Sequence, residues 1–482
     1  MEKVILASLL GLQLCSAQIS QNDFYQKESI PTPSGVELEI SCLSLASADT
    51  LVLGTRRGEI WRLSDIHNPD VDAIKWELLF NAAHEPLGIY ERDGWIYFTD
   101  RDAFARIGDQ DQNGSYESYE VISNSWGITG DYHEYNFGTS PDKNGDVWIV
   151  HCLTGSYSAK AQWRGWAQKV SPDGTTTPVV SGIRSPGGIG FNALGDVFYT
   201  DNQGLWNGTS CLKHLKPGSF TGNPSGNKFY KDAPHMGKEP PFPKNGSRIA
   251  SEAERIPEFV PPAIQFPHGK VGQSPTSILS SPHLKLFGLP SDQLIIGEHT
   301  HSELQRVFLE EVNGVYQGAV WKFINNMNTG VLSTDLSSKG TLFAGGSVRG
   351  WPSRGQQRFA LERLSWNGTS PLEMQKVEAL SDGFKVTFSE PIDPNCLTED
   401  FCSIEAWTYI YQGAYGSPEV DHVTPKVLSH TLDDSRTVLK LKVSALTKGH
   451  VHHLKLHNIL STSQKPLWHN DVYYTLNQIP SE

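Results

Sequence analysis

The chain contains 482 residues, of which 38% are hydrophobic and 19% are charged, and its formal net charge at pH 7 is -13. At roughly 100–200 residues per domain, this length predicts more than one structural unit, and the apolar content excludes a disordered chain. The acidic balance, without a run of Lys or Arg, also excludes a dedicated nucleic-acid-binding protein, because neutralising phosphates requires clustered cations.

The first residues have the pattern of a targeting segment. An apolar run from Val4 to Leu14 is followed by the small residues Ser16 and Ala17. The run is too short to cross a bilayer and is typical of a secretory signal peptide. We therefore predict a signal peptide at residues 1–17 and a secreted or periplasmic protein. The alternative left open is a buried N-terminal strand. No later stretch reaches about 18 apolar residues, so no transmembrane segment is predicted.

An internal repeat follows. A Gly- or Asp-led turn and a short β-rich run recur roughly every 50 residues, with one gap of about twice that length, which is close to the period of four-stranded propeller blades. Further short apolar segments flank each copy, as in a β-meander, and no long stretch has the 3.6-residue period of an amphipathic helix. The pattern predicts an all-β chain with a six-bladed β-propeller over residues 18–370. The six copies begin at Thr50, Gly94, Gly145, Gly195, Asp292 and Gly340.

Two regions fall outside the repeat. Residues 223–265 are rich in Pro, Gly and charge and have no set of three apolar segments, so they predict an insertion and not a seventh blade. Residues 371–482 alternate with period two and predict a small C-terminal β-sandwich of the Ig-like kind. Cys396 and Cys402 lie close enough in this region to form a small disulfide loop in an oxidising compartment. No CxxC or CxxCH occurs, which excludes a Cys-based zinc knuckle and an attached c-type haem.

The segment from residue 109 to residue 120 fits the calcium-loop pattern D-x-[DN]-x-[DN]-G-x5-E. Side-chain oxygens at positions one, three and five, a backbone carbonyl at seven and a carboxylate at twelve can surround one Ca²⁺. Strands, and not EF-hand helices, are predicted on both sides. The alternative is an acidic hairpin turn without metal. The predicted ligands are Asp109, Asp111, Asn113, Ser115 and Glu120.

Propellers bind ligands where loops of different blades converge at the mouth of the central channel. Polar residues at equivalent positions of the third to sixth repeats are therefore candidate site residues. Two alternatives stay open: His133 acts as a general base on a substrate hydroxyl, or His133, His299 and His301 hold a divalent metal with Glu298 or Asp201. The candidates are His133, Glu134, Arg184, Asp201, Asn202, Gln203, His268, Glu298, His299, His301, Arg349, Trp351 and Arg354.

The passages 133–135, 184–191 and 200–204 resemble the extracytoplasmic propellers of planctomycetes and verrucomicrobia that are labelled membrane-bound dehydrogenases. Segments 298–302, 314–319, 349–355, 407–411 and 415–421 extend the resemblance over nearly the whole mature chain. That family is distantly similar to the soluble glucose/sorbosone dehydrogenases, which are six-bladed propellers that use pyrroloquinoline quinone (PQQ) with Ca²⁺.

The resemblance implies oxidation of a carbohydrate or polyol hydroxyl. It implies that His133 abstracts the substrate proton, that Arg184 contacts the cofactor, and that backbone carbonyls of Asn202 and Gln203 bind the cofactor calcium. Because the chain carries no cytochrome c domain, the implied electron acceptor is a separate cytochrome c or another partner.

The chain also departs from the dehydrogenases. The strand at residues 329–334 has no Arg where they carry arginines, and His299 stands where they carry Lys, although PQQ has three carboxylates. Two further functions therefore stay open: a non-catalytic glycan- or protein-binding propeller, and a metal-assisted carbohydrate lyase or hydrolase.

Overall fold

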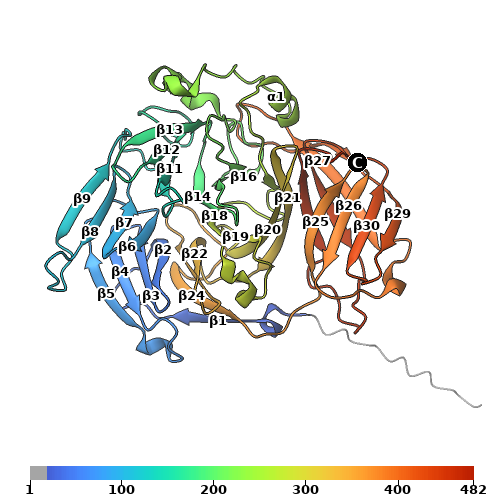
Figure 1. Ribbon diagram of the computed structural model, residues 1–482, viewed down its shortest axis with the longest axis horizontal. Coiled ribbons are helices and arrows are strands. Elements are labelled where there is room, and N and C mark those ends of the chain that lie inside the picture. The colour runs from blue at the N-terminus through green and yellow to red at the C-terminus, as the bar shows by residue number, and fades with distance from the viewer. Residues whose placement is uncertain (1–18, 482) are drawn as a thin grey trace, which may run out of the picture.

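The computed structural model describes residues 19–481, so the predicted signal peptide lies outside the described residues. The described chain is nearly all-β, as the sequence predicts, and its strands form six sheets of four strands and one sheet of eight. Figure 1 shows most of these sheets arranged around a central axis, with the C-terminal region beside them.

Four sheets are meanders in which consecutive strands pair in chain order. The first contains β2 (Ile40–Ser47), β3 (Thr50–Thr55), β4 (Ile60–Ser64) and β5 (Lys75–Phe80). The second contains β6 (Ile89–Arg92), β7 (Trp95–Thr99), β8 (Phe104–Gly108) and β9 (Ser118–Ser123). The third contains β10 (Asn136–Gly138), β11 (Val147–His151), β12 (Trp166–Val170) and β13 (Thr176–Ser181). The fourth contains β14 (Pro186–Phe191), β15 (Val197–Asp201), β16 (Ser210–His214) and β17 (Ile264–Phe266).

The next two sheets are completed by strands from elsewhere in the chain. In the sixth sheet, the early strand β1 (Tyr25–Ile30) pairs antiparallel with β24 (Phe359–Trp366), with Tyr25 opposite Trp366. The two ends of the repeat region therefore share one sheet. The repeat alone did not predict this strand. The fifth sheet begins with β18 (Pro275–Leu279), β19 (Gln293–Glu298), β20 (Glu303–Val312) and β21 (Val315–Ile324). The sixth contains β22 (Val331–Leu336), β23 (Thr341–Ser347), β24 (Phe359–Trp366) and β1 (Tyr25–Ile30).

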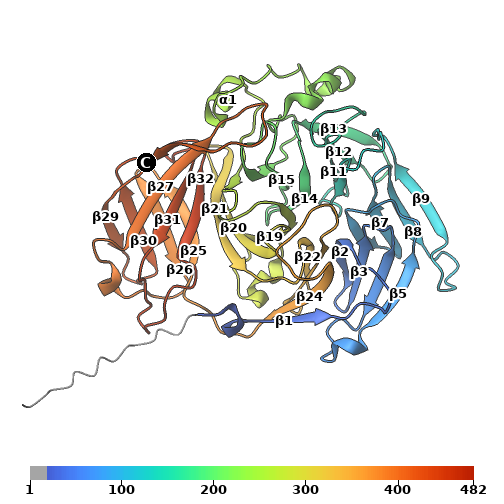
Figure 2. The ribbon, with the colours of Figure 1, turned by 180° about the vertical axis from the view of Figure 1, so that it is seen from behind.

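The first strands of these six sheets surround a common axis. β2 contacts β6 and β22, and β14 contacts β10 and β18. A cavity of about 210 Å³ lies between the six strands and is lined by residues of each. The backbones of neighbouring sheets approach each other closely at this axis. A Cβ on Gly88 would lie 2.4 Å from the carbonyl oxygen of Gly138, so a side chain at Gly88 would clash with the backbone. This arrangement is that of a β-propeller, and Figure 2 shows it from behind.

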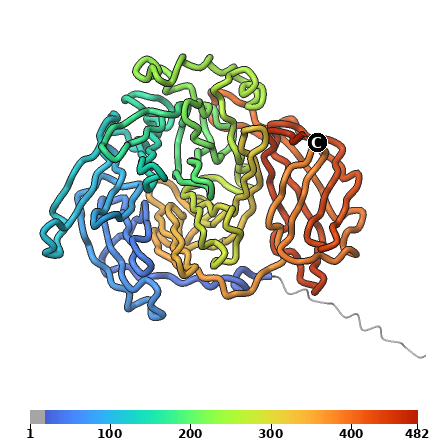
Figure 3. Tube along the Cα trace, viewed as in Figure 1, coloured from blue at the N-terminus to red at the C-terminus, as the bar shows by residue number. Residues whose placement is uncertain are grey.

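The C-terminal region is continuous with the fifth sheet. β21 pairs with β32, so one eight-stranded sheet runs from β18 to β28, and it packs against the four-stranded sheet β25-β26-β30-β29. The shared core includes Trp321 from β21 and Phe384 from β26. Figure 3 shows the two regions side by side. The remaining strands are β25 (Met374–Leu380), β26 (Gly383–Phe388), β27 (Cys402–Tyr409), β28 (Glu419–Val423), β29 (Val427–Leu432), β30 (Val438–Val443), β31 (His450–Leu456) and β32 (Asp471–Leu476).

The helices are short. The segment predicted as an insertion carries η3 (Pro224–Asp232), η4 (Pro234–Met236) and α1 (Ile249–Arg255); it follows β16 and ends within β17. No helix among the described residues is long and apolar enough to cross a membrane. The other helices are η1 (Gln21–Asp23), η2 (Val71–Ala73), η5 (Pro282–Phe287) and η6 (Pro394–Cys396).

The expectation of a disulfide between Cys396 and Cys402 is wrong for this structure, because both thiols are free. Cys396 ends η6, and its Sγ lies 2.8 Å from the carbonyl oxygen of Asp393. Cys402 begins β27, where burial raises the pKa of its thiol to about 12. The two residues therefore belong to different elements with different partners.

Candidate functional site

A cavity of about 440 Å³ collects side chains from several sheets and from the C-terminal region. A smaller pocket shares Ser185, Asn202, Ser274 and Trp351 with it and is also lined by Arg56 and Tyr135. The structure thus brings together residues far apart in the sequence. Six predicted site residues line the larger cavity: His133, Arg184, Asn202, Gln203, His268 and Trp351.

Arg184 is the main charge of the cavity wall. The residue is only 3% exposed, and its Nη1 donates to the carbonyl oxygens of Asn202 at 3.3 Å and Gln203 at 2.7 Å. Its Nε has no hydrogen-bond partner, and Arg184 forms no ion pair within residues 19–481. A buried cation without an anion is costly. The guanidinium is therefore available to a polar or anionic group of a ligand.

Two more residues of the wall carry buried polar atoms without partners. Asn202 donates through Nδ2 to the carbonyl oxygen of Ser185, while its Oδ1 is unpartnered. The indole Nε1 of Trp351 is also unpartnered, and its ring lies 5.2 Å from that of His299. Native proteins satisfy almost all buried polar groups. With the Nε of Arg184, these residues carry two donors and one acceptor that have no partner among the described residues.

His133 lies on the same wall. Its side chain is 41% exposed, and its Nδ1 is 4.0 Å from the Oδ1 of Asp131, which accepts the backbone N–H of His133. Partial burial, together with the guanidinium groups of Arg184 and Arg56, lowers the pKa of His133 against the opposing effect of Asp131. The imidazole is therefore neutral at pH 7 and has a free lone pair, as a general base requires.

A cationic network beside the cavity was not predicted. Arg56 donates through Nε to Glu85 at 2.6 Å and through Nη2 to the hydroxyls of Tyr132 and Tyr135, and Arg101 bonds the other oxygen of Glu85 at 2.8 Å. Arg56 and Arg101 follow β3 and β7, as Asn202 follows β15. Their position just after a repeated strand was therefore the sequence signal that could have identified them as site residues.

Three predicted carboxylates lie behind the wall and not in it. Glu134, Asp201 and Glu298 are fully buried. The carboxylate of Asp201 accepts the N–H of Ser185 at 2.8 Å and pairs with Lys213 at 3.0 Å.

The other two also bond local groups. Glu298 accepts the N–H groups of Gln273 and Ser274, and Glu134 accepts the hydroxyls of Thr129 and Thr154. Since Ser185, Gln273 and Ser274 line the cavity, Asp201 and Glu298 shape the wall without facing a ligand.

The predicted histidine metal site is not formed. His299 is fully buried, its Nε2 is 2.8 Å from the carbonyl oxygen of Ser347, and burial lowers its pKa to about 4. The Nδ1 of His301 faces Glu303. In the part of the chain that the structure describes, the one clustered set of potential metal ligands contains no histidine. Local hydrogen bonds hold these rings away from His133.

Arg349 and Arg354 also lie outside the cavity wall. Arg349 pairs with Glu39 at 2.9 Å, and its carbonyl oxygen accepts a bond from Arg56. Arg354 is exposed, and its backbone N–H donates to the carbonyl oxygen of Thr300. Neither side chain therefore contributes to the wall of this cavity, and their predicted roles in binding stay predictions.

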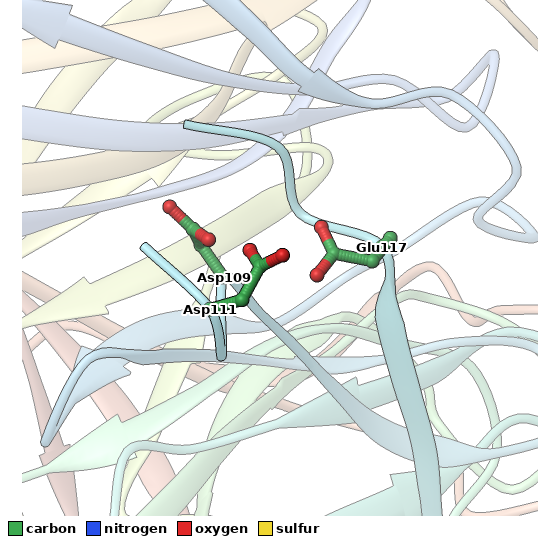
Figure 4. Close-up of side chains that lie close together, drawn as sticks. All are labelled: Asp109, Asp111 and Glu117. Atoms are coloured by element: carbon green, nitrogen blue, oxygen red, sulfur yellow. The ribbon is translucent and has the colours of Figure 1, made fainter. Parts of the chain in front are cut away.

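The acidic loop between β8 and β9 lies in the second sheet. Figure 4 shows Asp109, Asp111 and Glu117, whose carboxylate oxygens lie within 4.8 Å of one another. The predicted ligand Glu120 instead lies opposite Arg106 and pairs with it at 2.6 Å. Glu120 thus lies outside this cluster, because the strand register pairs it with Arg106.

The other two predicted ligands stay within the loop. The Oδ1 of Asn113 accepts the N–H of Ser115 at 2.7 Å, and the N–H of Asn113 donates to Asp109 at 3.0 Å. These bonds fold the segment into a compact turn.

No family model and no curated protein matches the chain. Solved structures match it at low identity. The PQQ-bound aldose sugar dehydrogenase of Streptomyces coelicolor is 14% identical, with a TM-score of 0.51, over 71% of this chain and 98% of that chain. The PQQ domain of pyranose dehydrogenase from Coprinopsis cinerea is 11% identical, with a TM-score of 0.48, over 71% and 95%. A Trichoderma reesei protein of the carbohydrate-active enzyme family AA12 is 12% identical, with a TM-score of 0.49, over 71% and 96%. The match to the aldose sugar dehydrogenase shows that the chain shares its propeller fold.

Proposed function

We propose that the protein binds a carbohydrate or polyol in the cavity lined by Arg184, Asn202 and Trp351. The observation that carries this proposal is the set of buried, unpartnered polar atoms on these three residues of one wall. Hydroxyl groups both donate and accept hydrogen bonds, so a polyhydroxylated ligand can satisfy all three. The cavity also has aromatic side chains, which suit the apolar face of a sugar ring.

Titration calorimetry against a panel of sugars, uronates and polyols tests the proposal. We expect Arg184→Met to weaken binding by roughly tenfold or more, because a hydrogen bond to a charged group is lost. Arg57→Met is the matched control, since Arg57 is half-exposed and pairs with Glu37 away from the cavity. Absence of binding across the panel, or equal affinity of the wild type and Arg184→Met, contradicts the proposal.

Oxidation of a ligand hydroxyl is the second candidate function, and the neutral, half-exposed His133 favours it. His133 would take the hydroxyl proton while the carbon gives its hydride to a separate acceptor, such as a quinone; a cytochrome c could then take up the electrons. Sugar-dependent reduction of a dye, lost in His133→Ala while binding persists, would support this candidate. Binding without turnover would leave a non-catalytic binding propeller.

PQQ with its calcium does not fit this wall. Arg184 is the only Lys or Arg among the described residues that line the cavity, whereas PQQ carries three carboxylates. The carbonyl oxygens of Asn202 and Gln203, which the resemblance assigns to calcium, instead accept hydrogen bonds from Arg184. We therefore assign no step to PQQ. A metal-assisted lyase or hydrolase is likewise unsupported, since no histidine among residues 19–481 belongs to a group of three or more potential metal ligands.

Several structural assignments also remain proposals. We take the six sheets as six blades over residues 18–370, and residues 371–482 as an Ig-like β-sandwich, because six first strands surround one cavity and two later sheets share a core. We place the protein outside the cytoplasm after removal of residues 1–17, as in the family that the sequence resembles; sequencing the N-terminus of the mature protein tests this. We also propose a Ca²⁺ site at Asp109, Asp111 and Glu117.

A further inference from the structure

We propose that the C-terminal region completes the ligand site. In this inference Tyr415, on the segment between β27 and β28, stacks on an outer ring of an oligosaccharide. The inference rests on the proposed carbohydrate ligand. It assigns a binding role to a region outside the six sheets that form the ring around the axis.

Tyr415 lines the same cavity as Arg184 and His133. Its ring centroid is 5.2 Å from the Cζ of Arg184, and the residue is 59% exposed. The guanidinium supports one face of the ring by a cation–π contact. An exposed aromatic ring that borders a cavity offers a flat apolar face to a ligand.

The segment that carries Tyr415 is fixed to the loop after β15. The N–H of Gly416 donates to Gly204 at 3.0 Å, that of Trp206 to Gln412 at 2.7 Å, and that of Ser417 to Gly208 at 3.0 Å. Within the segment, the Nε2 of Gln412 donates to the carbonyl oxygen of Gly416 at 3.0 Å. The ring is therefore held in place before a ligand arrives, which reduces the entropy lost on binding.

Gly416 shows how closely the C-terminal segment packs against the cavity wall. Its φ is +64°, and a Cβ at this position would lie 2.9 Å from the Cδ of Gln203, another residue of the wall. The C-terminal segment and the wall thus meet without space for a side chain at Gly416.

A second exposed tyrosine extends the rim. Tyr157, on the segment between β11 and β12, is 56% exposed and lines the same cavity. The wall therefore has a buried polar part, with Arg184, Asn202 and Trp351, and an exposed aromatic part, with Tyr157 and Tyr415. A ligand that contacts both parts extends from the interior to solvent, which favours more than one sugar ring.

The test measures binding of cello-, xylo- and malto-oligosaccharides of one to six units, and of oligogalacturonates, to the full chain. We expect wild-type affinity to rise from one unit to two or three units. Tyr415→Ala should reduce this rise, with a loss of roughly three- to tenfold for the longer ligands that exceeds any loss for the monosaccharide. Tyr415→Phe should retain the rise, because it keeps the aromatic face.

Tyr119→Ala is the matched control, because Tyr119 is 46% exposed and lies on β9 outside the cavity. If the wild type and Arg184→Met show the expected difference but Tyr415→Ala keeps the full rise, this inference is wrong and the proposed function stands. An equal loss of affinity for monosaccharides and longer ligands also overturns it. If the wild type binds no member of the series, both proposals fail.

Discussion

Arg184 shows how a single side chain changes the chemistry expected of a site. Its strand-end position and the resemblance both pointed to a cavity residue, and the structure places it there. The sequence could not predict that its guanidinium would bond the carbonyl oxygens of Asn202 and Gln203. That contact depends on how two loops are placed in space, and it brings a guanidinium to the carbonyl oxygens that the resemblance assigns to calcium.

The burial of His299 predicts a pH-dependent stability. Its pKa in the folded protein is about 4, whereas an unfolded histidine titrates near 6.5. Between these values the unfolded chain binds more protons, so stability falls as pH falls. For this residue we expect a loss of about 2 kcal/mol between pH 7 and pH 5.

Urea unfolding of the wild type and His299→Gln at both pH values measures this effect. Glutamine can still donate to the carbonyl oxygen of Ser347, so the variant should fold and should lose about 2 kcal/mol less than the wild type. His452, whose pKa burial lowers to about 3, contributes equally to both proteins. The same pH dependence in both proteins would contradict the prediction.

At the scale of elements, the hairpin β8–β9 shows what a motif can and cannot specify. The pattern identified a carboxylate-rich turn, but it counted positions as if the loop extended to Glu120. Antiparallel register places Glu120 opposite Arg106 and leaves Glu117 at the acidic cluster. Register is decided by cross-strand pairing and turn geometry, so the spacing alone could not distinguish the two glutamates.

Calcium should stabilise this hairpin by relieving repulsion among three clustered carboxylates. With free Ca²⁺ at about 100 times its Kd, the stabilisation should be about 2.7 kcal/mol, and EDTA should remove it. Thermal unfolding in Ca²⁺ and in EDTA measures the effect. Glu117→Gln should abolish the difference, and the matched variant Glu120→Gln should retain it. The reverse result would restore the ligand set that the pattern predicted.

At the scale of the whole molecule, the early strand β1 contacts the sixth sheet, the fifth sheet and the C-terminal region. β1 completes the sheet of β22, β23 and β24. Tyr25, at its start, packs against Phe287 and Phe323 and stacks on Trp468 of the C-terminal region at 6.1 Å. Its hydroxyl donates to the carbonyl oxygen of Phe287 at 3.2 Å. The strand therefore closes the ring and anchors the C-terminal region to it.

Tyr25→Ala should destabilise the protein by about 3 kcal/mol, because it leaves a cavity among large aromatic side chains. Gln26→Ala on the same strand is the matched control; its side chain is exposed, so we expect a change within about 0.5 kcal/mol. Denaturant unfolding followed by tryptophan fluorescence measures both. A cost for Tyr25→Ala that is no larger than that for Gln26→Ala would mean that β1 does not hold the ring closed.

By itself, the sequence determined the β-rich character of the chain, the spacing of the repeat, the acidic turn and the strand-end positions that supply the cavity residues. These properties are local, because alternation, turn residues and repeat spacing act over a few neighbouring positions. Only the tertiary structure decided that β1 pairs with β24, that Glu298 and His299 are buried, and that Tyr415 reaches the wall beside Arg184. Each of these depends on contacts between distant segments, whose distances and orientations are fixed only when the sheets pack together.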